Sequence, residues 1–196
     1  MKHFPAVPVL LMLVLVACGN SFAAPPDDPV RKNPEGVGID GYSPVSYFTE
    51  GKPQKGDPAF SFEHDGVTYH FTSQEQIELF ESDPDRYLPA HGGWCTLMMG
   101  GSGRRTPADA ENFVIVDDRL MLFWSGDQEN TRGLGLVNWG RKTEGDPDKE
   151  REYIARADKQ WDSFLSGKRK SRVYLYKPRD SESVSDVQRE GAKVEY

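Results

Sequence analysis

Residues 59–71 alternate between apolar and polar side chains on both sides of the dipeptide Asp65-Gly66. Alternation with a period of two is typical of strands that bury one face, and Asp-Gly favours a two-residue type I′ turn. Pairing outward from this turn predicts a β-hairpin with two unlike faces. The core face would carry Phe60, Phe62, Val67, Tyr69 and Phe71, and the outer face Ser61, Glu63, Thr68 and His70.

A helix is expected directly after this hairpin. Ser73 is a good N-cap, Gln76 completes a Ser-x-x-Gln capping box, and Pro84 ends the run. A second hairpin is expected around Asp117-Asp118, with strands over residues 113–116 and 120–124.

A last helix is expected between the cap Asp146, followed by proline, and Gly167. Its inward stripe would consist of Ile154, Ala157, Trp161 and Leu165. The order hairpin, helix, hairpin, helix predicts an α+β fold, a small single domain of two β-hairpins packed with helices. Beyond the likeness of the two hairpins, the sequence shows no internal repeat.

Residues 1–23 are typical of an export signal, with Lys2 near the start, an uncharged apolar run and then small residues. The segment Leu15–Cys18 (LVAC) resembles a bacterial lipobox, which would lipidate Cys18. Ordinary cleavage after Ala23 is the alternative. Either route predicts an exported bacterial protein, periplasmic or anchored to the membrane through a lipid.

Composition divides the rest of the chain. Residues 24–40 are rich in proline, glycine and charge, so a flexible tether is expected, and residues 177–196 have too few apolar side chains to predict more than a disordered tail. The folded domain would span 41–176. The formal net charge of −7 argues against a nucleic-acid partner, because a basic face is needed to neutralise phosphates.

Five separated segments carry a family resemblance. They are Gly41–Phe48 (GYSPVSYF), Tyr69–Ser73 (YHFTS), Phe80–Leu88 (FESDPDRYL), Gly92–Cys95 (GGWC) and Ala157–Trp161 (ADKQW). Together they resemble the YHS domain family, in particular its exported bacterial branch with a Gly-Gly-aromatic-Cys element. The resemblance covers about residues 39–161 and implies a YHS-like domain over 41–176, in a family of poorly characterised function.

The resemblance also bears on metals and redox chemistry. A branch attached to copper-transporting ATPases carries cysteines in a treble-clef-like arrangement, but this chain has Ser46, Thr72 and Gln76 at those places. A structural zinc site is therefore not expected, since hydroxyl and amide groups do not replace thiolates. The exported branch keeps one cysteine, matched here by Cys95, and some members carry selenocysteine, which implies redox chemistry.

Cys95 is accordingly the main candidate for catalysis and for metal binding. The preceding Gly92-Gly93 would let backbone N–H groups approach its sulfur. The alternative is a small buried side chain that only fills the core.

Three further residues are candidate metal ligands beside Cys95. His91 would share a face with Cys95 if one helical turn joined them, although the two glycines oppose a continuous helix. His70 lies on the outer face of the first hairpin. Met98 would offer a thioether to Cu(I), so copper is the candidate cofactor.

Two classes of function remain open. The first is binding of a thiophilic metal, or a single-thiol redox reaction, at Cys95. The second is a non-catalytic interaction module with a structural Cys95 and an exposed aromatic surface around Trp94 and Trp139 for a protein partner. The chain has no Cys-x-x-Cys, which excludes dithiol exchange of the thioredoxin kind within one chain.

Overall fold

The computed structural model describes residues 28–126, 134–170 and 173. These residues form two antiparallel two-stranded sheets and several helices, so the α+β fold is confirmed. In chain order the elements are η1 (Ile39–Gly41), α1 (Ser46–Thr49), β1 (Asp57–His64), β2 (Val67–Phe71), α2 (Gln74–Ser82), α3 (Pro84–Tyr87), η2 (Ala90–Gly93), α4 (Thr96–Ser102), β3 (Asp109–Val116), β4 (Arg119–Phe123), α5 (Leu134–Thr143) and α6 (Pro147–Leu165).

The first hairpin has the expected turn. Asp65 and Gly66 both have positive φ, as a type I′ turn requires. Pairing near the turn follows the predicted register, but a bulge farther out places Phe71 opposite Asp57 instead of Phe60. The second hairpin turns at the predicted Asp117-Asp118, again with positive φ at both residues.

The two hairpins belong to a gapless structural repeat that the sequence did not show. Asp57 pairs with Phe71 in the first hairpin, and Asp109 pairs with Phe123 in the second, an offset of 52 residues (109 minus 57). Every other pair of β1–β2 has its counterpart in β3–β4 at the same offset. Each hairpin also has the bulge at the same place.

The repeat begins before the strands. Residues 39–41 and 91–93 form two left-handed turns, each with three consecutive positive φ values. Each turn leads into an aromatic residue that bridges to the segment before the hairpin, Tyr42 to Lys55 and Trp94 to Pro107. We call residues 39–72 repeat 1 and residues 91–124 repeat 2. Each repeat also has a glycine with positive φ after its short helix, Gly51 after α1 and Gly103 after α4.

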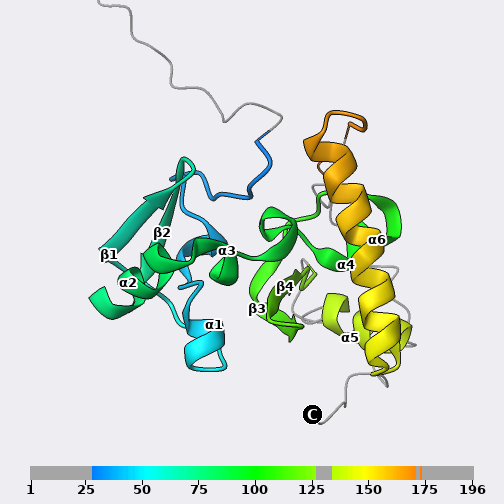
Figure 1. Cartoon of the computed structure of the whole chain (residues 1–196), viewed down its shortest axis with the longest axis horizontal. Coiled ribbons are helices and arrows are strands. Elements are labelled where there is room, and N and C mark those ends of the chain that lie inside the picture. Colours follow the sequence, from blue (N-terminus) through cyan, green and yellow to red (C-terminus); the bar gives the residue numbers. More distant parts are fainter. Residues whose placement is uncertain (1–27, 127–133, 171–172, 174–196) are drawn as a thin grey trace, which may run out of the picture.

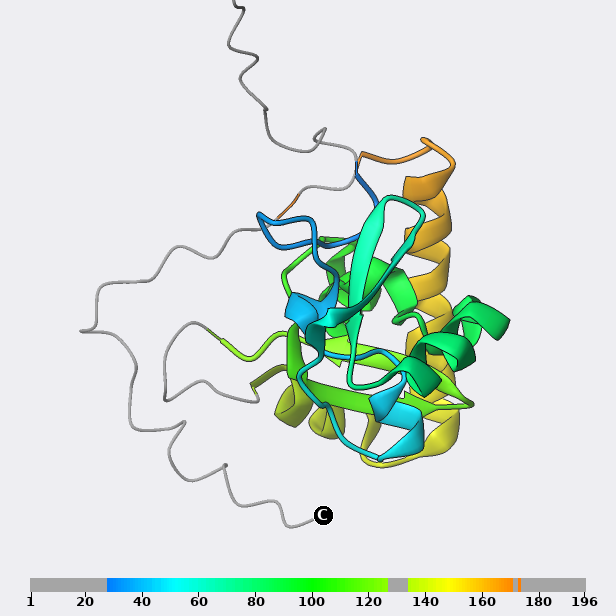
Figure 2. The same ribbon diagram turned by 90° about the vertical axis from the view of Figure 1, so that its left-hand side faces the viewer.

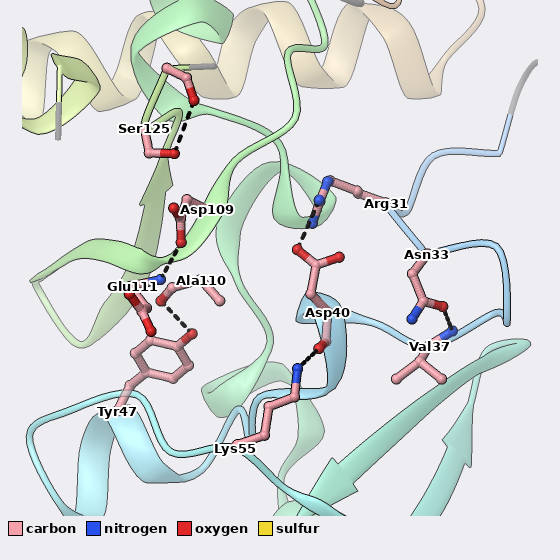
Figure 3. Close-up of polar contacts among 11 residues, drawn as sticks. Arg31, Asn33, Val37, Asp40, Tyr47, Lys55, Asp109, Ala110, Glu111 and Ser125 are labelled. Carbon is pink, nitrogen blue, oxygen red and sulfur yellow. Dashed lines mark hydrogen bonds and ion pairs between the residues drawn. The ribbon is translucent and has the colours of Figure 1, made fainter. Parts of the chain in front are cut away.

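Repeat 1 packs on the start of β3 in repeat 2. The Tyr47 hydroxyl donates to the Ala110 carbonyl oxygen at 2.7 Å (Figure 3). The Tyr47 ring also meets the Phe113 ring edge-on. Burial raises the pKa of Tyr47, which keeps this hydroxyl protonated as a donor. The two repeats therefore share one core.

Helix α6 covers repeat 2 on the side away from the β1–β2 hairpin (Figures 1 and 2). Asp146 caps it as predicted, by accepting from the N–H groups of Asp148 and Lys149. Of the predicted inward stripe, Ile154 and Ala157 are buried, but Leu165 is exposed because it lies at the helix end. Within the described residues, no helix has the length and apolar character needed to cross a membrane.

Two sequence-based expectations need correction. The tether was expected to reach residue 40, yet residues 28–40 lie on the domain, with Val37 and Ile39 buried and Arg31 ion-paired to Asp40 (Figure 3). Trp94 and Trp139 do not form an exposed aromatic surface, because 8% and 3% of their surfaces are accessible. The signal, residues 24–27 and the tail 177–196 lie outside the described residues.

Candidate functional site: a shielded thiol beside a buried histidine network

Cys95 is held by the backbone on both sides. Its N–H donates to the Thr106 carbonyl oxygen at 2.9 Å, and its own carbonyl oxygen accepts from the N–H of Met99 at the start of α4. The residue thus lies where the extended segment after η2 becomes a helix. Its side chain belongs to the core and is 0% exposed.

Two opposing effects act on the Cys95 thiol. Burial raises its pKa above the ordinary value. The backbone N–H groups of Trp124, Met98 and Leu97 lower the pKa by a smaller amount, because they interact with the sulfur and favour its negative form. The group is therefore a thiol at neutral pH, in surroundings that already contain donors for a thiolate.

Thr106 is the nearest cross-strand neighbour of Cys95. The bridge between Trp94 and Pro107 is antiparallel, so Cys95 and Thr106 are opposite residues, whose side chains lie on one side of the ladder. Thr106 is 3% exposed, and its hydroxyl has no hydrogen-bond partner in the described part of the chain. Such a buried, unsatisfied hydroxyl is unusual and calls for an explanation.

His91 does not pair with Cys95 as the one-turn interpretation proposed. The residues between them form a left-handed turn instead of a right-handed helical turn. The buried imidazole uses both nitrogens elsewhere: Nδ1 lies 3.1 Å from Thr96 Oγ1 and Nε2 lies 3.0 Å from Asp158 Oδ1. His91 thus joins the start of α4 to α6.

Asp158 is the charged centre of this network. Arg119, at the start of β4, donates to both carboxylate oxygens, at 3.0 and 2.8 Å. Burial alone would raise the pKa of Asp158, but the hydrogen bonds from His91 and Arg119 and the arginine charge outweigh it and hold that pKa well below its usual range.

The Asp158–His91–Thr96 series has the order of groups that activates a hydroxyl nucleophile. Thr96 is 0% exposed, however, and its Oγ1 also lies 3.6 Å from Met121 Sδ. A buried hydroxyl with these neighbours offers no place for a substrate. The network therefore serves to hold η2, α4, β4 and α6 together.

The four predicted metal ligands lie on different elements: His91 is in η2, Cys95 directly precedes α4, Met98 is in α4 and His70 is in β2. His70 lies in repeat 1, where its ring is close to Gly41, and Met98 is a half-buried residue of α4. Within residues 28–126, 134–170 and 173, no three His, Cys, Asp or Glu side chains form a group that could hold a metal ion.

The N-terminal segment closes over the turn that precedes Cys95. Trp94 donates its indole N–H to the Pro29 carbonyl oxygen at 2.8 Å, and the N–H of Arg31 donates to the Gly92 carbonyl oxygen at 2.8 Å. Gly92 lies between this segment and Trp161 of α6. The Gly-Gly-Trp-Cys element is consequently covered from two sides.

Sequence reasoning missed four residues of the site: Thr96, Thr106, Arg119 and Asp158. Thr96 directly follows the GGWC segment and Asp158 lies within ADKQW, but nothing local indicates their partners. Only the structural repeat singles out Thr106, because it aligns the Cys95–Thr106 backbone bond with the Ser43–Gln54 bond.

Comparison with known proteins adds no assignment: no family model, no curated protein and no solved structure matches this chain.

Proposed function

We propose that this protein is an exported YHS-type module whose function is a single-thiol redox reaction at Cys95, with an oxidant small enough to reach a buried sulfur. The observation that carries the proposal is the position of Cys95 as the N-cap residue of α4, where the backbone N–H groups of Leu97 and Met98, with that of Trp124, lower the pKa of its thiol against the larger effect of burial. These donors favour the thiolate, which is the reactive form of cysteine.

Redox chemistry fits the surroundings of Cys95 better than metal binding does. A thiophilic ion is held by several converging soft or imidazole ligands. The nearest candidate, His91, already uses both ring nitrogens for Thr96 and Asp158. Copper binding is therefore the weaker form of the thiol hypothesis.

The second candidate is the non-catalytic interaction module. The complete burial of Cys95 favours it, because free cysteines in cores are commonly structural. The aromatic surface first suggested for a partner is buried around Trp94 and Trp139. Such a module would need a different surface.

The cellular setting is part of the proposal. The signal over residues 1–23 supports export, and the lipobox ending at Cys18 supports a lipid anchor. The resemblance to the exported YHS branch, in which selenocysteine occurs, supports redox chemistry over simple packing. After either processing route, Cys95 would be the only free thiol of the mature chain, since the chain has two cysteines.

The test is treatment of the processed, folded protein with hydrogen peroxide, followed by peptide mass mapping. We expect oxygen to be added at Cys95, with a rate that rises with pH because burial raises the thiol pKa and only the thiolate reacts. Peptide mapping separates this product from methionine oxidation. Cys95→Ser is the control for the mapped mass change.

A size comparison sharpens the test. A bulky maleimide should label Cys95 only in denaturant, since the side chain is 0% exposed. Oxidation of Cys95 by peroxide only in denaturant would contradict the redox function and favour the interaction module.

A further inference from the structure

The two repeats place a small side chain at one equivalent point. Ser43 in repeat 1 and Cys95 in repeat 2 each donate a backbone N–H, at 2.9 Å, to the segment before the hairpin, to Gln54 and Thr106 respectively. Each residue is 0% exposed. Repeat 1 therefore indicates which polar atoms can lie next to the side chain at the position shared by Ser43 and Cys95.

In repeat 1, an oxygen atom lies against this side chain. The Ser43 hydroxyl donates to Gln76 Oε1 at 2.7 Å, and the N–H of Thr72 donates to the same oxygen at 3.2 Å. The residue equivalent to Thr72 is Trp124, whose N–H interacts with the Cys95 sulfur. Residue 128, the equivalent of Gln76, lies outside the described residues.

Repeat 2 adds a second donor at this place. Thr106 lies opposite Cys95 across the ladder, and its buried hydroxyl has no partner in the described part of the chain. A hydroxyl left unsatisfied beside an apolar thiol is costly, but it would be satisfied by an oxygen bound to that sulfur. The Thr106 hydroxyl and the N–H of Trp124 thus provide donors from two segments.

We propose that Cys95 forms a stabilised sulfenic acid, whose oxygen is held by the Thr106 hydroxyl and by the N–H of Trp124, the counterpart of the Thr72 N–H that donates to Gln76 Oε1 in repeat 1. This inference rests on the proposed redox function and names its product. Thr106 is a positioning residue, because it acts on the oxidised sulfur after the chemical step.

The co-reactant is a hydroperoxide. The thiol first gives its proton to solvent, and the thiolate sulfur then attacks one peroxide oxygen. The S–O bond forms as the O–O bond breaks, the sulfur loses two electrons, and the leaving hydroxide or alkoxide takes up a proton. Burial keeps out a second thiol, so the sulfenic acid is not converted to a disulfide.

The experiment measures how long the sulfenic acid lasts. Processed wild-type protein, Thr106→Val and Thr106→Ser are treated with hydrogen peroxide, and the products with one and with two added oxygens on the Cys95 peptide are followed by mass spectrometry. Valine keeps the shape of threonine without the hydroxyl, and serine keeps the hydroxyl. Thermal melting checks that all three are folded.

We expect Thr106→Val to shorten the life of the singly oxidised form by about three- to tenfold, the range that the loss of one hydrogen bond gives. Thr106→Ser should restore the wild-type lifetime within about twofold. Equal lifetimes in Thr106→Val and wild type would overturn the role of Thr106 and leave the redox function standing. Absence of any oxygen on Cys95 in folded wild-type protein would overturn both.

Discussion

His91 Nε2 lies 3.0 Å from Asp158 Oδ1, and this contact joins the left-handed turn before Cys95 to the last helix. In repeat 1 the equivalent of His91 is Ile39, which is buried. The scaffold thus tolerates an apolar residue at this point. The histidine of repeat 2 is explained by helix α6, which packs against this turn and supplies Asp158 to the imidazole.

Asp158→Asn should destabilise the protein at neutral pH by about 1–2 kcal/mol, because it removes the negative charge and replaces Oδ2, which accepts from Arg119, with an NH2 group that only donates. The expected loss of unfolding free energy is small because the Asp158 carboxylate is partly exposed and screened by solvent. The folded-state pKa of Asp158 is lowered, so its contribution is complete above the unfolded pKa of about 3.9 and is lost as pH falls below that value.

Urea unfolding at pH 7 and near pH 2 measures this prediction. The difference between wild type and Asp158→Asn should shrink at the lower pH. Glu144→Gln is the control, because its ion pair with Lys149 is exposed to solvent and its loss should change the free energy of unfolding little at either pH. A difference independent of pH would contradict the charged role of Asp158.

His91→Ala should cost about 2–4 kcal/mol, because it creates a cavity and leaves Thr96 and Asp158 without their shared partner. The rate at which peroxide oxidises folded Cys95 should change by less than about twofold, since neither ring nitrogen serves the thiol. Denaturant melts and peroxide kinetics on one sample measure both. A folded His91→Ala protein with an unreactive Cys95 would restore the direct His91–Cys95 pair.

Gly92→Ala tests the covering N-terminal segment. A Cβ at Gly92 would lie 2.7 Å from the Pro29 carbonyl oxygen and 3.0 Å from Trp161, and the φ of +62° adds strain. Gly66→Ala is a matched control, with a φ of +72° and no atom within 4 Å of the added Cβ. We expect about 1 kcal/mol of destabilisation for Gly66→Ala and about 2–3 kcal/mol for Gly92→Ala.

The segment itself gives a second measurement of the same prediction. Trypsin should cleave after Arg31 faster in Gly92→Ala than in Gly66→Ala, since the N–H of Arg31 bonds to the Gly92 carbonyl oxygen. Equal cleavage rates would show that residues 28–33 do not depend on this turn.

The sequence predicted the structure correctly where the conformation depends on residues adjacent in the chain. The turn at Asp65-Gly66 and the cap Asp146 follow from local chemistry, and both were correct. Helix α4 was not predicted, because its Gly100 and Gly101 lower the helix propensity of this segment. Gly100 is nevertheless needed there, since a Cβ would lie 2.4 Å from the ring of Tyr153.

Contacts between distant segments were beyond sequence reasoning. The composition of residues 24–40 is that of a tether, but burial of the Val37 and Ile39 side chains fixes the end of this segment on the domain. The partner of His91 lies on α6, and no spacing rule links the two. Repetition was hidden because the repeats share backbone turns more than side chains.

Lipidation of Cys18 stays a prediction, because residues 1–27 lie outside the described residues. Mass spectrometry of the mature N-terminus should find a lipidated cysteine at position 18. Cys18→Ala should leave the membrane fraction, since each buried methylene of a lipid chain contributes about 0.8 kcal/mol to anchoring. A mature chain that starts at Ala24 would show that the ordinary cleavage site is used.

Cys95→Ser separates a reactive thiol from one that only packs. The substitution places a hydroxyl at a 0% exposed point of the core, so we expect a cost of about 1–3 kcal/mol unless the hydroxyl finds an acceptor. Ser43 shows that the fold can bury a hydroxyl at the equivalent position when Gln76 Oε1 accepts its hydrogen bond. A cost well below 1 kcal/mol would thus indicate that repeat 2 supplies a similar acceptor.

Cys95→Ala is the comparison for that measurement, since it removes the sulfur without adding a polar group. If the thiol only packs, both variants lose stability and neither loses any reaction. If the redox function is right, both lose the part of the peroxide consumption that occurs at Cys95, whatever their stability, because neither side chain forms an S–O bond, and only the slower methionine oxidation remains. Melting and peroxide consumption on the same samples decide between these outcomes. Unchanged peroxide consumption in folded Cys95→Ala would leave Cys95 as a structural residue and the protein as an interaction module.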